Sequence, residues 1–198
     1  RLMKKLAMAL LLLGDRGRSV EDDYFRRKDR ELLDRAREQE AVAACRRELA
    51  LALGVDDDAT IGALASLGFD AATVPLLEIV PAVQVGWADG TLPASERAEI
   101  ERLLTRPGMQ AAAQAGRRFV NEWLARQPDG DLYRFATEAL RLRASRLDAD
   151  ARTSLVNRIV EDCSAVAGVS GGVFGLGARS SAEADRIRAI AAALGAKS

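Results

Sequence analysis

Apolar residues recur every three to four positions along almost the whole chain, and runs of β-branched residues are short. Such spacing gathers apolar side chains on one face of an α-helix, and the abundant alanine also favours helix. The pattern therefore predicts an all-α protein of about nine helices. The expected helices cover approximately residues 2–13, 19–53, 59–67, 73–87, 93–104, 109–126, 132–147, 149–167 and 181–194.

Helix ends are marked by glycines and acidic residues. Gly54 and Gly68 follow expected last turns, where a left-handed residue commonly ends a helix. The run Asp56-Asp57-Asp58 is typical of a helix start, although three acids in a row are also compatible with cation binding. The segment 76–87 is apolar on most sides. This predicts a helix at the centre of the fold, kinked at Pro81.

The sequence divides into an N-terminal part, residues 1–54, and a helical domain, residues 55–198. Arginines alternate with acids along the expected helix 19–53, which is typical of a solvated helix. Its apolar residues form a stripe too thin to predict a coiled coil: Val20, Tyr24, Phe25, Leu32, Leu33 and Leu49. The apolar run 6–13 is shorter than the roughly 20 residues that cross a bilayer. It predicts either a short helix packed on the core or a helix that contacts a membrane surface or a partner.

Composition narrows the range of functions. The 198 residues have a formal net charge of zero, which argues against a nucleic-acid-binding protein. Histidine is absent, which excludes Ser-His and Cys-His nucleophile pairs and histidine-ligated zinc. Cys45 and Cys163 form no CxxC motif, so we interpret them as small buried side chains in a reducing cytosol. We therefore expect a cytoplasmic protein that is not an enzyme.

Two segments of the chain resemble each other. Residues 92–103 and 179–190 each follow an apolar helix and a glycine-containing turn. Their matched positions are Glu96 with Glu183, Ile100 with Ile187, and Leu103 with Ile190. The match indicates two related helical halves packed around one core, although any two capped amphipathic helices share part of it.

The stretch Val83-Gln84-Val85-Gly86-Trp87-Ala88-Asp89-Gly90-Thr91-Leu92-Pro93-Ala94-Ser95-Glu96-Arg97 resembles the tellurite-resistance TerB-like family. The shared features are an apolar helix that ends in Ala-Asp-Gly, then a hydrophobic residue, a proline and a glutamate on the next helix. The resemblance implies an all-helical fold, a role in stress response or in membrane-associated complexes, and a divalent-cation site. The residues of this chain that match the implied cation site are Asp89 and Glu96. The second half departs, because Ser170-Gly171-Gly172 stands in place of Ala-Asp-Gly.

A calcium or magnesium ion needs about six oxygen ligands. Asp89 and Glu96 offer two carboxylates seven positions apart, and Glu78 and Glu183 are the candidates for further ligands. The structural alternative is that Asp89-Gly90 is an ordinary turn and Glu96 an ordinary acid in a first helical turn. Glu78 lies in a strongly apolar segment, where it can pair with an arginine, line an interface or bind the ion.

Other features favour structural roles. Gly168 to Gly177 is rich in glycine but lacks the lysine of a phosphate-binding loop. We therefore interpret this segment as a tight loop whose apolar side chains fill the core. The less favoured alternative is an anion site beside Arg179. Trp87 and Trp123 are expected to anchor the core.

Three functions follow from these observations. The first is a non-enzymatic, TerB-like interaction protein that presents helical surfaces to partner proteins, with a Ca²⁺ or Mg²⁺ ion as its one cofactor. The second is an assembly module that mediates homo-oligomerisation or membrane-surface contact without a metal. The third, and weakest, is a carboxylate-dependent hydrolase that uses a metal.

Overall fold

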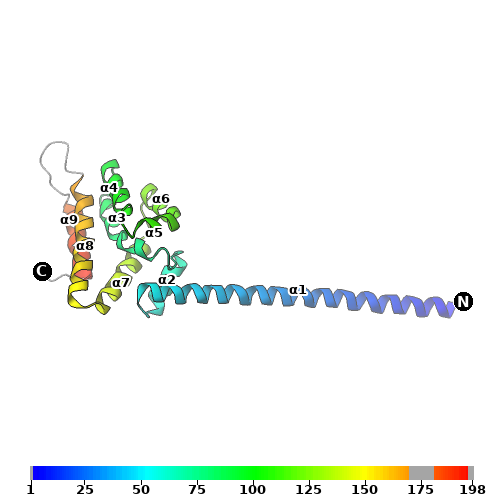
Figure 1. Ribbon diagram of the computed structural model, residues 1–198. Coiled ribbons are helices and arrows are strands. Elements are labelled where there is room, and N and C mark those ends of the chain that lie inside the picture. Colours follow the sequence, from blue (N-terminus) through cyan, green and yellow to red (C-terminus); the bar gives the residue numbers. More distant parts are fainter. Residues whose placement is uncertain (1, 170–180, 196–198) are drawn as a thin grey trace. The chain divides into compact units, whose positions relative to one another are not determined.

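The computed structural model describes residues 2–169 and 181–195, with side chains from residue 24 onward. Within these residues it is all-helical, with nine α-helices and no strand, as the sequence predicts (Figure 1). The elements are α1 (Leu2–Leu53), α2 (Asp58–Ser66), the 3-10 helix η1 (Val74–Glu78), α3 (Val80–Gly86), α4 (Ala94–Leu104), α5 (Gln110–Ala115), α6 (Arg117–Ala125), α7 (Gly130–Arg146), α8 (Ala149–Gly168) and α9 (Ser181–Ala193).

The chain consists of two units. Unit 1 is Arg1–Ala44, and unit 2 is Cys45–Ser198. Helix α1 provides the described residues of unit 1 and continues into the first residues of unit 2. Leu49 and Leu53, in its last turns, are buried and belong to the core of unit 2.

Helix α1 is continuous where the sequence predicted two helices. The expected break between residues 13 and 19 is therefore wrong, although Gly14 and Gly17 lie there. A glycine inside a helix costs only about 1 kcal/mol, and good helix formers on both sides tolerate it. The predicted end is confirmed, because Gly54 has a φ of 69° and stops the helix. The side chains of the apolar run 6–13 lie outside the described residues.

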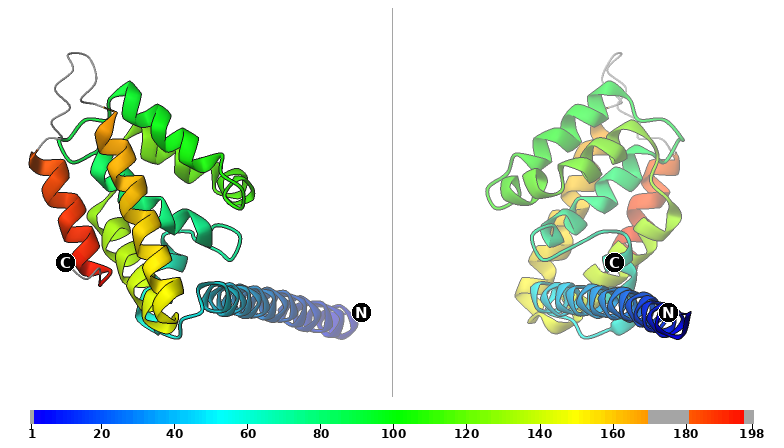
Figure 2. Two further views of the ribbon diagram at one scale, coloured as in Figure 1. Left: turned by 60° about the vertical axis from the view of Figure 1, so that its left-hand side comes forward. Right: turned by 90° about the vertical axis from the view of Figure 1, so that its right-hand side faces the viewer.

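Helix α3 lies at the centre of unit 2, as its apolar sequence predicted. It contacts α4, α7, α8 and α9, and the views in Figure 2 show these helices around it. Ile79, Ala82 and Val85 are fully buried. The helices of the predicted repeat, α4 and α9, each contact both α3 and α8. A common origin of the two halves stays a prediction.

Two expected helices are each divided. The segment 73–87 forms η1 and α3, and a proline stands in the first turn of each. Pro81 thus begins α3 instead of kinking a longer helix, because a proline at a helix start loses no hydrogen bond. The segment 109–126 divides at Gly116 into α5 and α6. A Cβ at Gly116 would lie 2.3 Å from Leu76 Cδ1, so the chain passes η1 too closely for a side chain.

Aspartates cap α2, α7 and α8, and the cap of α2 lies in the acidic run that the sequence singled out. Asp57 accepts a hydrogen bond from the backbone N–H of Thr60 at 2.8 Å, and Asp148 accepts one from Ala151 at 2.8 Å. The Thr60 hydrogen bond lowers the pKa of Asp57. The acidic run at residues 56–58 therefore contains the predicted cap.

Candidate functional site

The Ala88-Asp89-Gly90 turn joins α3 to α4. Gly90 has a φ of 81°, a left-handed conformation that favours glycine, and its N–H donates to Trp87 O at 2.9 Å. Asp89 is exposed at this turn. Glu96, in the first turn of α4, is only 3% exposed. The two predicted ligands of the turn therefore differ sharply in their access to solvent.

Glu96 packs closely against α3. Its Oε2 lies 3.3 Å from the place that a Cβ on Gly86 would take, and Leu92 Cδ1 lies 2.7 Å from the same place. Glycine at position 86 therefore leaves the room in which the Glu96 carboxyl lies. Sequence reasoning quoted Gly86 within the motif but gave it no role.

Glu183 is the counterpart of Glu96 in the second half of the predicted repeat. It lies in the first turn of α9 and is 4% exposed. An acid in a first turn is usually solvated, so the burial of both glutamates is a structural similarity that the sequence did not predict. Ser180 lies outside the described residues, and so does the rest of the predicted glycine-rich loop from residue 170.

The described residues contain no group of three or more Asp, Glu, Cys or His side chains placed to hold a metal ion. Asp89 and Glu96 alone do not supply the roughly six oxygen ligands that a calcium or magnesium ion needs. An ion at Asp89 and Glu96 would need backbone carbonyls, water or residues beyond the described ranges. Cation binding therefore stays a prediction.

Glu78 lies at the end of η1 and pairs with two arginines. Its Oε1 accepts from Arg143 of α7 at 3.2 Å, and its Oε2 accepts from Arg158 of α8 at 2.7 Å. Glu78 is 9% exposed. The sequence left three roles open for Glu78: to pair with an arginine, to line an interface or to bind an ion. In the structure, Glu78 pairs with arginines.

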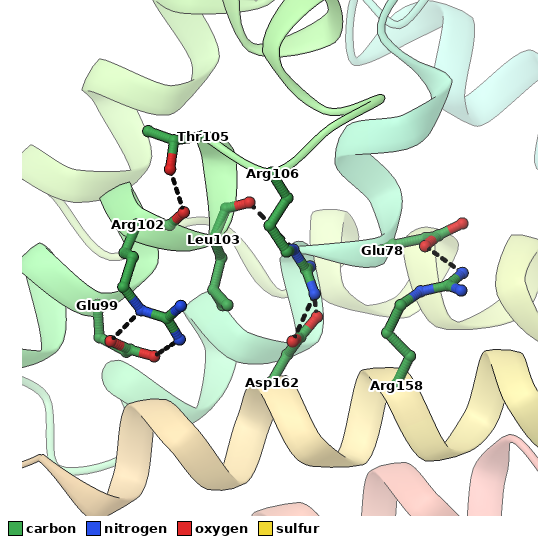
Figure 3. Close-up of polar contacts among 8 residues, drawn as sticks. All are labelled: Glu78, Glu99, Arg102, Leu103, Thr105, Arg106, Arg158 and Asp162. Carbon is green, nitrogen blue, oxygen red and sulfur yellow. Dashed lines mark hydrogen bonds and ion pairs between the residues drawn. The ribbon is translucent and has the colours of Figure 1, made fainter.

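A second buried acid, Asp162, lies on α8 one helical turn after Arg158 (Figure 3). Arg106, in the turn between α4 and α5, donates to both of its carboxylate oxygens, at 2.8 and 2.6 Å. Burial raises the pKa of Asp162, and the hydrogen bonds from Arg106 oppose that shift. Sequence reasoning missed Asp162, but the signal was present. Asp162 follows Leu155 by seven positions and Ile159 by three, which places it on the apolar face of α8.

The two buried acids and their arginines form what we call the acid–arginine network: Glu78, Arg106, Arg143, Arg158 and Asp162. It connects η1, α7, α8 and the α4–α5 turn. Arginine stays protonated at any physiological pH and exchanges no proton. The arrangement can therefore hold helices together but does not offer a general acid–base pair.

Three aromatic side chains of unit 2 form a stack that includes two residues of α6. Phe69, Phe119 and Trp123 stack, with ring centroids 5.3 to 6.2 Å apart. Trp123 is 6% exposed, which confirms its predicted role as a core anchor. Trp87 is half-buried, and its Nε1 donates to Trp123 O at 2.8 Å.

Both cysteines are free thiols. Cys163 is fully buried in α8, and burial raises its pKa to about 12. Cys45 is half-buried. Because the thiolate is the nucleophilic form, Cys163 is inert at neutral pH. The expected small buried thiol is confirmed at position 163.

The comparisons with known proteins identify no relative. No family model, no curated protein and no solved structure matches the chain. Among the described helices, none combines the length and apolar character that crossing a membrane requires.

Proposed function

We propose that this protein is a non-enzymatic interaction protein that associates with a second copy of itself through α1. One observation carries the proposal: from residue 24 onward, where side chains are described, five large apolar side chains of this helix in unit 1 are each more than half exposed. They are Tyr24 (56%), Phe25 (59%), Leu32 (55%), Leu33 (56%) and Val42 (54%), which we call the apolar row.

Two residues of the row are placed to contact a helical partner together, although the stripe is narrow. Phe25 and Leu32 are seven positions apart and share one face of α1. The Tyr24 and Phe25 rings meet edge to face, with centroids 5.8 Å apart. Burial of such side chains against another chain releases about 25 cal/mol per Å² of apolar surface. A helix–helix contact is therefore favoured once a partner is present.

Charge is compatible with self-association. Asp34 pairs with Arg37 of the same helix at 3.5 Å, and arginines and acids alternate around the apolar row. The whole chain has a net charge of zero, so two copies have no net repulsion to overcome. Every copy carries the same row, which makes a second copy the simplest partner of matching chemistry.

The non-enzymatic character rests on the described chemistry of unit 2. Glu78 and Asp162 face arginines, and Cys163 stays protonated at neutral pH. The resemblance of residues 83–97 to TerB-like proteins supports a role in stress response. It also supports a Ca²⁺ or Mg²⁺ ion at Asp89 and Glu96. Calorimetric titration with each ion tests this part. Heat that disappears in Asp89→Asn supports it, and no heat in the unsubstituted protein removes it.

Sedimentation velocity of the full chain tests the association. We expect a concentration-dependent oligomer that dissociates in Phe25→Gln/Leu32→Gln, because both substitutions remove apolar surface from one face of α1. Ala41→Gln, at an exposed position of the same helix, is the matched control. Circular dichroism checks that α1 stays helical in both.

Two results overturn the proposal. One is a protein that stays monomeric at every concentration tested. The other is an oligomer that persists unchanged in the double variant. A monomeric protein that binds anionic phospholipid vesicles, and that loses this binding in the double variant, favours membrane-surface contact instead.

A further inference from the structure

One face of α1 in unit 1 differs between its two ends. Side chains that are alternately four and three positions apart lie on the same face of a helix. Within residues 24–44, the spacing that passes through Phe25 and Leu32 selects six positions. We call them the pairing face: Phe25, Asp29, Leu32, Ala36, Gln39 and Ala43. The large apolar side chains lie towards one end of this face and the small ones towards the other.

The pairing face is complementary to itself when it is read in the opposite direction. From its two ends inward, its residues form three pairs: Phe25 with Ala43, Asp29 with Gln39, and Leu32 with Ala36. The members of each pair are equally distant from Asp34 along the chain. Two antiparallel copies of α1 centred at Asp34 therefore bring all three pairs face to face.

The two apolar pairs place a large side chain opposite a small one. Phe25 and Leu32 are each more than half exposed, and the exposed Ala36 leaves room for a partner side chain. Large side chains opposite small ones fill a helix–helix contact without voids. A parallel copy would instead place Phe25 opposite Phe25 and Ala43 opposite Ala43, which crowds one end and leaves a gap at the other.

The polar pair distinguishes the two orientations most clearly. Asp29 and Gln39 are exposed, and neither forms a hydrogen bond or ion pair with another residue in the described part of the chain. In an antiparallel pair, the Gln39 amide can donate to the Asp29 carboxylate of the other copy. In a parallel pair, Asp29 would face Asp29, and such a juxtaposition of like charges is unfavourable.

Charge along α1 favours the same orientation. Residues 26–30 contain four basic side chains and one acidic side chain, whereas residues 31–40 contain four acidic and two basic ones. An antiparallel copy centred at Asp34 places residues 26–30 opposite the region of Glu38 and Glu40. A parallel copy places them opposite the same basic residues. Complementary charge steers two copies towards the first arrangement.

We infer that α1 pairs with α1 of a second copy in the antiparallel orientation, with Asp34 near the centre and the pairing faces in contact. The inference rests on the proposed association through this helix, and it names the surface that the partner contributes. The same surface of each copy forms the contact, so the pair has twofold symmetry and closes as a dimer. Size, hydrogen bonding and charge each favour this orientation.

Cysteine crosslinking of the full chain tests the orientation. The background is Cys45→Ser, because Cys163 is fully buried and stays protonated at neutral pH. Phe25→Cys and Ala43→Cys are prepared separately in this background. The two positions lie about 27 Å apart along one helix. In an antiparallel pair, a short thiol crosslinker therefore joins the two variants when they are mixed, and it joins neither variant to itself.

A charge substitution tests the polar pair. Gln39→Lys should strengthen the association roughly threefold to tenfold at low ionic strength, because the added ammonium faces Asp29 of the other copy twice in each dimer. The same substitution should bring no gain in an Asp29→Asn background. Ala41→Lys adds the same charge on the opposite side of α1 and is the matched control. Sedimentation velocity over a range of concentrations measures the affinities, and circular dichroism checks that α1 stays helical.

Different results overturn the orientation and the association. Crosslinking of each variant to itself without a mixed product, or a weaker association in Gln39→Lys, indicates a parallel pair and leaves the association standing. An oligomer that gives no crosslinked product in any mixture places the contact elsewhere and also overturns the orientation. An unsubstituted protein that stays monomeric at every concentration removes the proposed association, and the antiparallel pair with it.

Discussion

Unit 1 exposes large apolar side chains, whereas unit 2 buries acidic ones. In unit 1, Phe25 and Leu32 are exposed, whereas in unit 2, Glu78 and Asp162 are buried. Both arrangements depart from the usual preference, which places apolar side chains inside and acids outside. The buried acids have their partners in the same unit, where arginines satisfy them. For the exposed apolar row, the proposed partner is another chain.

Matched leucine substitutions provide the largest expected effect and the most direct test of this contrast. Leu140 is 2% exposed in α7, and Leu32 is 55% exposed in α1. Leu140→Ala should lower the free energy of unfolding by about 2–5 kcal/mol, since it leaves a cavity. Leu32→Ala should change it by less than about 0.5 kcal/mol.

Urea denaturation followed by circular dichroism measures both values, at a protein concentration low enough to keep the chain monomeric. A loss for Leu32→Ala as large as that for Leu140→Ala would mean that the apolar row is covered within one chain. That outcome would remove the contrast between the units.

Removal of the Glu78 charge tests the buried side of the comparison. Glu78→Gln should cost about 1–3 kcal/mol, because Arg143 and Arg158 lose a charged acceptor in a partly buried setting. Glu138→Gln is the control, since the side chains of its pair with Arg141 are 38% and 49% accessible and a smaller loss is expected. Equal losses in urea denaturation would show that burial does not strengthen the acid–arginine network.

A glycine substitution tests how tightly unit 2 is packed. A methyl group at Gly116 would meet Leu76 Cδ1 at 2.3 Å and Ala112 O at 3.2 Å, so Gly116→Ala should cost about 1–3 kcal/mol. Gly130→Ala meets nothing within 4 Å and should be neutral or stabilising by up to about 1 kcal/mol. Thermal unfolding compares the two, and a neutral Gly116→Ala would show that η1 and the junction between α5 and α6 are not closely packed.

This last case shows where sequence reasoning stops. Helix identity came from local signals, such as the apolar period, the acidic run 56–58 and Gly54. The close approach at Gly116 involves Leu76, which is forty positions away, and no local signal reports that contact. The continuity of α1 through Gly14 was missed for the opposite reason, because a weak local preference against helix was given too much weight.

The candidate sites show the same limit. Glu78 stood out because its neighbours in the sequence are apolar, but its two arginine partners are distant along the chain. The burial of Glu96 could not be predicted, since a glutamate in a first turn is expected to be solvated. Among the described residues the buried Tyr133 hydroxyl has no hydrogen-bond partner, and no pattern in the sequence predicts this.

The smallest expected effect concerns an ion pair within α4, between the half-buried Glu99 and the exposed Arg102. The hydrogen bonds from Arg102 hold the pKa of Glu99 below its usual 4.5. A carboxyl whose pKa is lowered by folding stabilises the folded state above its unfolded pKa. That contribution is lost as the pH falls through the folded pKa. Arg102→Gln should therefore reduce stability slightly at pH 7, and the difference from the unsubstituted protein should shrink well below pH 4.5.

Urea midpoints measured across this pH range test the expectation, with Glu99→Gln and the double variant completing a thermodynamic cycle. Arg102 is exposed, with 63% of its side chain accessible, so solvent and salt should weaken the coupling further. A coupling that is independent of both pH and salt would contradict an ionic origin. It would then have to come from contacts of the arginine stem, and charge would play no part in this pair.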